Sequence, residues 1–382
     1  MNHQFDISFC IPTYNFGRFI GETLDSIIGQ ADDRVQIVIV DGGSTDETAR
    51  VVAEKARLFP YIKFVQRQER SGVDRDILET VVQADGEFCW LFSSDDILAP
   101  GALAEVRRQC AAGWDVFLTN FAICNLNMNR FGSHRILAVQ ETETFDWSDP
   151  DQRTRYFTLA ETTTAFFSFI SALVIRRSSW LRVPAQTQFI GSCWIIAAQL
   201  FALSREQLKV RYFPGELVLK RGDNDSFMGA GLVNRIGISV DGFRTLAAHY
   251  FGAASREAWH VSRVVKNEYT LLVMLIYKVA IDSQKNAVAN QKFSALVERH
   301  YADGLALDFL RRNILFTPAS ILRMLMNIYR RLKPLRRVAE SVLQIARRRE
   351  RQQREGCPPT TASAGPHPTA LPNQPARTRP AA

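Results

Sequence analysis

The sequence has few cysteines for its length, and none of them stands in a pattern that serves a structural role. Its 382 residues contain six cysteines, scattered singly along the chain without a CxxC pair. Disulfide frameworks and zinc sites need cysteines at close, regular spacings. The sequence therefore predicts reduced, buried thiols in an intracellular protein.

Long apolar runs and leader segments are also missing. The first residues, MNHQFDISFCIP, contain no charged stretch followed by an apolar one, so no signal peptide is expected. The most apolar late segment, 269–281, is too short to span a bilayer and contains Lys278. A dinucleotide-binding GxGxxG is lacking too, since the first apolar run continues as PTYNFG, and this argues against a dehydrogenase.

Positive charge is concentrated late in the chain. The formal net charge is +8, yet residues 311–355 alone hold 13 Arg or Lys and three Glu. In 321–355, Leu, Met and Ile alternate with Arg at helical spacing, which predicts a basic amphipathic helix that binds an anionic membrane surface. A solvated helix face is the alternative. The interleaved aromatic residues of single-strand binders are absent, so no nucleic-acid partner is expected.

Apolar runs of strand length alternate with helical periodicity in the first 92 residues. This alternation, with crossovers of about a dozen residues, predicts a parallel, doubly wound α/β sheet. Ligands of such sheets bind at the carboxyl ends of strands, where this chain carries PTYN, DGGSTD and SSDD. The predicted strands cover 7–11, 35–40, 61–66 and 87–92, and the predicted helices cover 16–29, 45–59 and 74–84.

The part of the sequence from residue 115 onward completes a first domain and predicts two further regions. Strands are expected at 115–121, 165–175 and 216–220, and they complete a first domain over 1–228 with halves at 1–120 and 121–228. A helical, basic extension over 229–355 follows. Residues 356–382 are rich in Pro, Ala and Thr, which predicts a disordered tail.

The motif DGGSTDET at 41–48 ends a strand and opens a helix. Gly43 and its neighbour Gly42 allow tight backbone geometry, and the polar residues that follow suit a helix start. A strand–helix turn explains these residues but not Asp41, a carboxylate at the strand end that could accept hydrogen bonds from a base or ribose.

The motif FSSDD at 92–96 places Asp95 and Asp96 side by side at the end of an apolar run. Mg²⁺ and Mn²⁺ use one or two carboxylates together with substrate phosphates, so the pair predicts a metal site that neutralises a diphosphate leaving group. A helix N-cap formed by Ser94 to Asp96, before a helix over 98–110, is an equally weighted alternative.

Three motifs in one β-α-β frame together resemble the inverting family-2 glycosyltransferases: CIPTYN, IVIVDGGSTDET and ADGEFCWLFSSDD. Members of that family have the GT-A fold, a mixed Rossmann-like sheet flanked by helices. The resemblance implies transfer from a nucleotide-diphosphate sugar with Mg²⁺ or Mn²⁺ held by Asp95 and Asp96, and a catalytic part for Asp96. The residues implied in binding the nucleotide sugar are Pro12, Thr13, Tyr14, Asn15, Asp41, Gly43, Gly72, Asp74, Arg75, Ser94, Asp95 and Arg221. Where the family often has two consecutive acids, this chain has Asp41–Gly42, and its DxD position reads Ser94–Asp95–Asp96.

Segments at 166–180, 189–200 and 221–227 look like the abequosyltransferase-like branch of that family. That resemblance implies a lipid-linked O-antigen saccharide as acceptor and a place on the inner face of the cytoplasmic membrane. Apolar core packing is the alternative explanation for the first two segments.

The general base is the weakest expectation. Many family members carry an acidic pair where this chain reads GSCW at 191–194. Inverting transfer needs a group that takes the proton of the acceptor hydroxyl, and Asp223, Asp225 and Glu161 are the candidates. The missing acid leaves a second interpretation open, a nucleotide-sugar-binding module without transferase activity.

Overall fold

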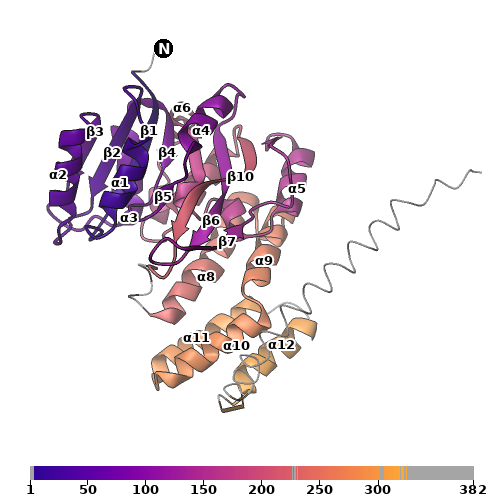
Figure 1. Ribbon diagram of the computed structural model, residues 1–382. Helices are drawn as coiled ribbons and strands as arrows, with labels where there is room; N and C mark the ends of the chain where they lie inside the picture. Colours follow the sequence, from indigo (N-terminus) through magenta and orange to yellow (C-terminus); the bar gives the residue numbers. More distant parts are fainter. Residues whose placement is uncertain are drawn as a thin grey trace, which may run out of the picture. The chain divides into compact units, whose positions relative to one another are not determined.

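The computed structural model describes residues 4–301 except 226, 228 and 230, and then 305–318, 320, 321 and 324. The first four strands form a parallel sheet in the order β3-β2-β1-β4, with helices between them (Figure 1). Thr13 at the end of β1 lies opposite Asp41 at the end of β2. The elements are β1 (Phe5–Thr13), α1 (Ile20–Ile28), β2 (Val35–Asp41), α2 (Thr48–Leu58), β3 (Ile62–Gln66), α3 (Val73–Gln83) and β4 (Gly86–Leu91).

The remaining strands extend this sheet and make it mixed. Beyond β4 the order continues β9-β6-β10-β5, with β9 and β5 antiparallel to their neighbours and β6 and β10 parallel to each other. Strands β7 and β8 pair with β6 and β10 at the side. These strands are β5 (Ile97–Leu98), β6 (Val116–Cys124), β7 (Arg130–His134), β8 (Glu143–Asp146), β9 (Leu173–Arg176) and β10 (Lys209–Arg221).

Helices cover the sheet and continue beyond it. Helix α7 is buried at all nine of its residues, as expected for a helix that is apolar on every side. The helices and short 3-10 turns of this part are α4 (Ala102–Cys110), α5 (Pro150–Leu159), η1 (Thr163–Phe166), η2 (Ile170–Ala172), α6 (Arg177–Arg182), η3 (Thr187–Phe189), α7 (Ile195–Leu203), α8 (Leu232–Phe251), α9 (Arg256–Glu268), α10 (Leu271–Ser283), α11 (Ala287–His300) and α12 (Leu305–Phe316).

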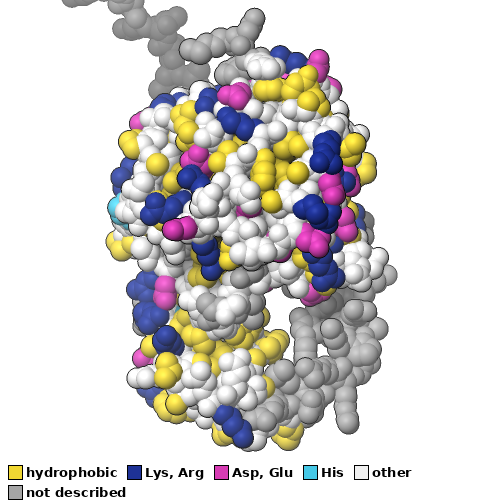
Figure 2. Space-filling model, turned by 90° about the vertical axis from the view of Figure 1, so that its left-hand side faces the viewer, with side chains coloured by type: hydrophobic (Ala, Val, Ile, Leu, Met, Phe, Trp, Pro, Cys, Tyr) yellow, Lys and Arg dark blue, Asp and Glu magenta, His cyan; other side chains and the backbone are white. Residues whose placement is uncertain are grey.

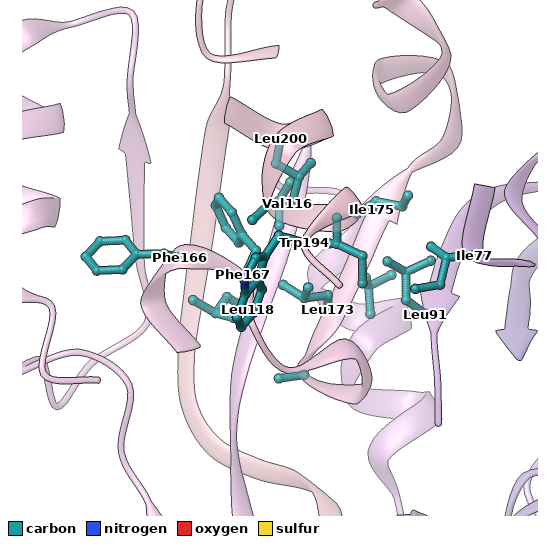
Figure 3. Packing of buried hydrophobic residues seen from close by; sticks show 14 of the residues in the cluster. Ile77, Leu91, Val116, Leu118, Phe166, Phe167, Leu173, Ile175, Trp194 and Leu200 are labelled. Carbon is teal, nitrogen blue, oxygen red and sulfur yellow. The ribbon is translucent and has the colours of Figure 1, made fainter. Parts of the chain in front are cut away.

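One apolar core joins both halves of the sheet. Figure 3 shows Ile77 of α3 and Leu91 of β4 beside Leu173 of β9, with Trp194 and side chains of α7 on the other side. Trp90 stacks on Phe9 with ring centroids 5.1 Å apart, and its indole N–H donates to the carbonyl of Ser171 at 2.9 Å. This hydrogen bond therefore ties β4 to the turn before β9.

Helices α8 and α9 pack on the sheet-bearing part. The ring of Phe243 on α8 lies 4.3 Å from Trp194, and Phe251 contacts Phe157 of α5. Residues Met1–Leu322 form one compact unit. The expected boundaries at 120 and 228 stay predictions, and the expected basic segment 321–355 and tail 356–382 lie outside the described residues apart from 321 and 324.

Surface charge on the described part is mixed in sign. In Figure 2, Lys and Arg side chains lie beside Asp and Glu, and Arg50 on α2 pairs with both Glu47 and Glu54. Among the described residues, no helix combines the length and apolar character that a membrane crossing requires.

Two local predictions were wrong. Of the expected strand at 165–175, only 173–175 are extended, as part of β9; before them lie two 3-10 turns, and Phe167 takes a left-handed φ of 65° that breaks the extended chain. The expected helix at 98–110 begins only at Ala102, after Gly101 with φ 77°. Ile97 and Leu98 instead pair with β10. Ser94 to Asp96 therefore cap no helix, and that alternative for the FSSDD motif is excluded.

Candidate active site

A cavity of about 450 Å³ opens at the carboxyl edge of the sheet. Its lining comes from three places: the ends of β1 and β2 with the start of α3, the acidic motif after β4, and a wall formed by η2, the start of α7 and the end of β10. Of the predicted residues, those that line it are Pro12, Thr13, Tyr14, Gly72, Ser94, Asp95, Asp96, Arg221, Asp223 and Asp225. Asn15, Asp41, Gly43, Asp74, Arg75 and Glu161 lie outside the lining.

One end of the cavity offers an aromatic face and unpaired oxygens. The guanidinium of Arg70 lies 4.6 Å from the centre of the Tyr14 ring. Behind them, Asp41 is fully buried; one of its carboxylate oxygens accepts the Ser44 backbone N–H at 2.9 Å and the Ser44 hydroxyl at 2.6 Å. The other oxygen of Asp41, like the Thr13 hydroxyl, has no hydrogen-bond partner among the described residues. Buried polar atoms are normally paired, so these two oxygens are exceptions, and of the two residues Thr13 lines the cavity whereas Asp41 lies behind it.

The loop after β2 is held in place by neighbours rather than by its own helix. The Asn15 amide oxygen accepts the backbone N–H of Thr45 at 2.8 Å, and the Asn15 N–H donates to the Ser44 hydroxyl at 2.8 Å. Gly43 has φ 86°, and a Cβ there would lie 2.9 Å from the carbonyl carbon of Glu69. Gly43 therefore permits the close approach of the loop after β2 to the backbone of Glu69, and Asn15 ties the loop after β1 to the loop after β2.

The acid pair is buried and held by many donors. The two oxygens of Asp96 accept the Ser171 hydroxyl at 2.6 Å and the Arg221 backbone N–H at 3.0 Å. Asp95 accepts from the Ser93 hydroxyl and from the Asn224 amide. Burial first, and then the charge of Asp95, raise the pKa of Asp96 to about 7.

The carboxylate oxygens of Asp95 and Asp96 are suitable ligands for a hard divalent cation. In the part of the chain that the structure describes, no group of three or more His, Cys, Asp or Glu side chains surrounds a common point. Two carboxylates at a cavity wall, with the remaining positions left to phosphate and water, match the way Mg²⁺ binds in nucleotide sites. A carboxyl with a pKa near 7 also loses its proton readily once a cation lies beside it.

Arg221 contacts both residues of the acid pair through hydrogen bonds. Its side chain is 3% exposed, and its guanidinium donates to the Asp95 carbonyl at 2.8 Å, to the Leu126 carbonyl at 2.7 Å and to Glu22 at 2.6 Å. With all of these donors engaged inside the protein, Arg221 fixes the end of β10 against the acid pair.

The opposite wall is apolar and aromatic, with cations at its rim. Phe167, Phe169 and Trp194 contribute rings, and the Lys220 ammonium lies 5.2 Å above the Phe169 ring. Such a wall suits the apolar face of a sugar ring. No acid lines this wall between 191 and 196; only Cys193, Trp194 and Ile196 do.

The three base candidates lie in different surroundings. Asp223 is exposed, lines the cavity, and has no partner among the described side chains. Asp225 also lines it but forms an ion pair with Arg235 at 2.6 Å. Glu161 pairs with Arg135 away from the lining.

Several lining residues were missed by sequence reasoning. Arg70 and Asp76 are the most notable: Asp76 is buried, accepts the Ser71 hydroxyl, and its carboxylate would touch a Cβ placed on Gly42. The two glycines before Ser44 were a usable signal that something packs closely there. Nothing local in the sequence marks Lys220, Phe169 or Arg235, which reach the cavity only through the tertiary fold.

Comparison with known proteins adds an independent line of evidence. Residues 8–180 match the family described as "Glycosyl transferase family 2". Abequosyltransferase RfbV of Salmonella typhimurium is 28% identical over 281 residues, which cover 71% of this chain and 84% of that protein. The putative glycosyltransferase EpsH of Bacillus subtilis is 28% identical over 116 residues, 30% of this chain and 33% of that one.

Among solved structures, residues 1–349 of TarS from S. aureus in complex with UDP-GlcNAc superpose with a TM-score of 0.54. The sequence identity is 17%, and the superposition covers 85% of this chain and 92% of TarS 1–349. At that identity the likeness shows a shared fold. The GT-A class predicted from the sequence, with a helical C-terminal region, is confirmed.

The raised pKa of Asp96 predicts a pH-dependent stability. Because its folded pKa of about 7 lies above its ordinary value of 3.8, the native state keeps a proton that the unfolded chain releases between these values. The free energy of unfolding should therefore gain on the order of 2–4 kcal/mol from this group as pH falls from about 8 to 5.

Denaturant unfolding of wild type and Asp96→Asn across this range measures that gain as the difference between the two proteins. The comparison is needed because His134 and His300, whose pKa values burial lowers to about 4, act in the opposite direction. A constant difference across the range would contradict the raised pKa of Asp96.

Proposed function

We propose that this glycosyltransferase, whose residues 8–180 match the model of glycosyl transferase family 2, moves a sugar from a nucleotide-diphosphate donor, with inversion, onto a lipid-linked saccharide. The pathway we propose is bacterial surface polysaccharide or O-antigen synthesis. One observation carries the proposal: a single cavity is lined by Tyr14 and the unpaired hydroxyl of Thr13, by the buried acid pair, and by Asp223, which has no partner among the described side chains.

The nucleotide binds at the Tyr14 end in this proposal. A base stacks on the Tyr14 ring beside Arg70, and its edge meets the unpaired oxygen of Asp41 and the hydroxyl of Thr13. Both groups lie at the edge where β1 and β2 end together. Pro12 and Gly72 form the adjacent walls.

The diphosphate is placed at Asp95 and Asp96, which would hold Mg²⁺ or Mn²⁺. Such a cation, when bound, neutralises the charge that develops on the leaving diphosphate. Ser171, Asn224 and the backbone of Arg221 keep the two carboxylates aimed at the cavity, so they need no rearrangement when the donor binds.

The acceptor hydroxyl is deprotonated by Asp223 in this proposal. An inverting transfer forms a bond from the acceptor oxygen to the anomeric carbon as the bond to the diphosphate breaks, and the hydroxyl proton passes to the base. Asp223 is open to the cavity, whereas Asp225 is neutralised by Arg235.

The proposed acceptor class is supported by RfbV, a relative that matches 71% of this chain. RfbV is named an abequosyltransferase, and we propose that this chain transfers a related sugar to an undecaprenyl-diphosphate-linked saccharide. Such acceptors lie in the cytoplasmic membrane. The basic segment 321–355 would hold the enzyme peripherally at its inner face.

Nucleotide binding is the first test. We expect one of CDP, UDP, GDP and dTDP to raise the melting temperature by several degrees with Mn²⁺ and by much less without it, since saturation at about 100 times Kd is worth ~2.7 kcal/mol. Asp96→Asn should lose the metal-dependent part. A protein that responds to none of the four, with or without Mn²⁺, would refute the proposed donor site.

The base is tested by Asp223→Asn with Asp225→Asn as the matched variant. Removal of a general base lowers turnover by about 10²–10⁴-fold, so Asp223→Asn should lose that much transfer while nucleotide binding is kept. Asp225→Asn should change transfer by less than about tenfold, because its carboxylate is already paired with Arg235. The reverse ranking would give the role to Asp225.

Membrane attachment is tested by deletion of residues 321–382. The full chain should sediment with vesicles containing phosphatidylglycerol and remain free of purely phosphatidylcholine vesicles, since each basic residue near an anionic surface contributes about 1 kcal/mol. The shortened chain should remain free of both kinds of vesicle. Equal binding of both proteins to the anionic vesicles would disprove this part of the proposal.

A further inference from the structure

Asp74 is a buried carboxylate that the proposed chemistry does not use. Asp74 is 2% exposed and lies in the first turn of α3. One of its oxygens accepts the backbone N–H groups of Gly191 at 2.7 Å and Cys193 at 3.0 Å, and the other accepts that of Ile195 at 3.3 Å. These three donors lie 117 or more residues away along the chain.

One of these donors, the Ile195 N–H, belongs to the first residue of α7, and the other two lie in the loop directly before the helix. The helix has no side-chain cap of its own, since its N-cap residue is Trp194, and the four residues before Ile195 contain no acid. The first N–H groups of any helix lack partners within it. Asp74 supplies from α3 the negative charge that this helix start lacks.

Both ends of this connection face the cavity. Gly72 and Val73, directly before Asp74, line its donor side, and Cys193 and Trp194 line its acceptor side. Gly191 and Cys193 hold left-handed φ values of 89° and 69°, and such a conformation costs free energy at a cysteine and must be held by its surroundings.

We infer that Asp74 is a positioning residue that fixes the acceptor-side wall, Gly191–Ile196, against the donor-side wall at the start of α3. The inference rests on the proposed function only in treating the cavity as the place of transfer. Asp74 does not contact substrate; it acts through the wall whose backbone it holds. Its carboxylate, predicted from the sequence to meet sugar hydroxyls and diphosphate, is directed instead at three N–H groups of the protein.

Cys193 provides a chemical reporter of this connection. Burial and the nearby negative charge of Asp74 raise the pKa of the Cys193 thiol to about 11. Cys110, whose pKa burial raises to about 12, lies outside the cavity lining and serves as an internal reference. Alkylation of Cys193 by iodoacetamide, followed residue by residue by mass spectrometry, therefore reports on the wall itself.

The test compares Asp74→Asn with Asp149→Asn in the full chain. Asp149 is the matched control because its carboxylate also accepts two backbone N–H groups at a helix start, that of α5, and it does not line the cavity. Loss of one charge-assisted hydrogen bond corresponds to about tenfold in an equilibrium. We expect Asp74→Asn to speed amide hydrogen exchange at 191–195 and alkylation of Cys193 by at least about that factor, with Cys110 unchanged.

Asp149→Asn should leave both rates at 191–195 as in wild type, even if it lowers the melting temperature equally. Nucleoside diphosphate binding with Mn²⁺ should stay within about threefold in Asp74→Asn, while transfer to a polyprenyl-linked saccharide extract of bacterial membranes falls at least about tenfold. Unchanged exchange and alkylation in Asp74→Asn, or an equal rise in Asp149→Asn, would overturn the inference. If the wild-type protein binds no nucleoside diphosphate, the proposed function is refuted, but the role of Asp74 in holding residues 191–195 is not.

Discussion

Two adjacent carboxylates buried at the edge of a sheet impose the constraint on which the rest of this site depends. Burial disfavours the charged form of Asp96, and Asp95 beside it adds repulsion. The chain compensates with donors from three separate segments: Ser171 before β9, the backbone of Arg221 at the end of β10, and Asn224 beyond it. The acid pair can exist only where these segments converge, so the mixed half of the sheet is a requirement of the site.

The strand order follows from that requirement. Strand β9 inserts antiparallel next to β4, which brings Ser171 beneath Asp96. Strand β10 runs from the core to the cavity and ends in Arg221, whose guanidinium joins the carbonyl of Asp95 to Glu22 on α1. In the proposed function, the parallel half supplies the nucleotide end of the cavity, and the mixed half supplies the residues that hold the acid pair and the wall that faces the acceptor.

The parallel half could be predicted from the sequence because its signals are local. Alternating apolar runs locate the strands; Asp41 is the last residue of β2, and Asp95 and Asp96 lie in the short loop between β4 and β5. The acceptor wall could not, because left-handed residues such as Phe167 end extended runs without any marker in composition. The partners of Asp74 and Arg221 are more than 90 residues distant, and no periodicity encodes such contacts.

The carboxylates around the cavity differ in role because their surroundings differ. Asp74 meets three backbone N–H groups and is committed to structure. Asp41 is paired at one oxygen and unpaired at the other, which suits recognition of a polar ligand edge. Asp96 is buried next to a like charge, so a cation stabilises it more than any neutral donor could. Asp223 is exposed, lines the cavity and has no partner among the described side chains. For that reason we propose Asp223, and none of the other three, as the group that takes the proton of the acceptor hydroxyl.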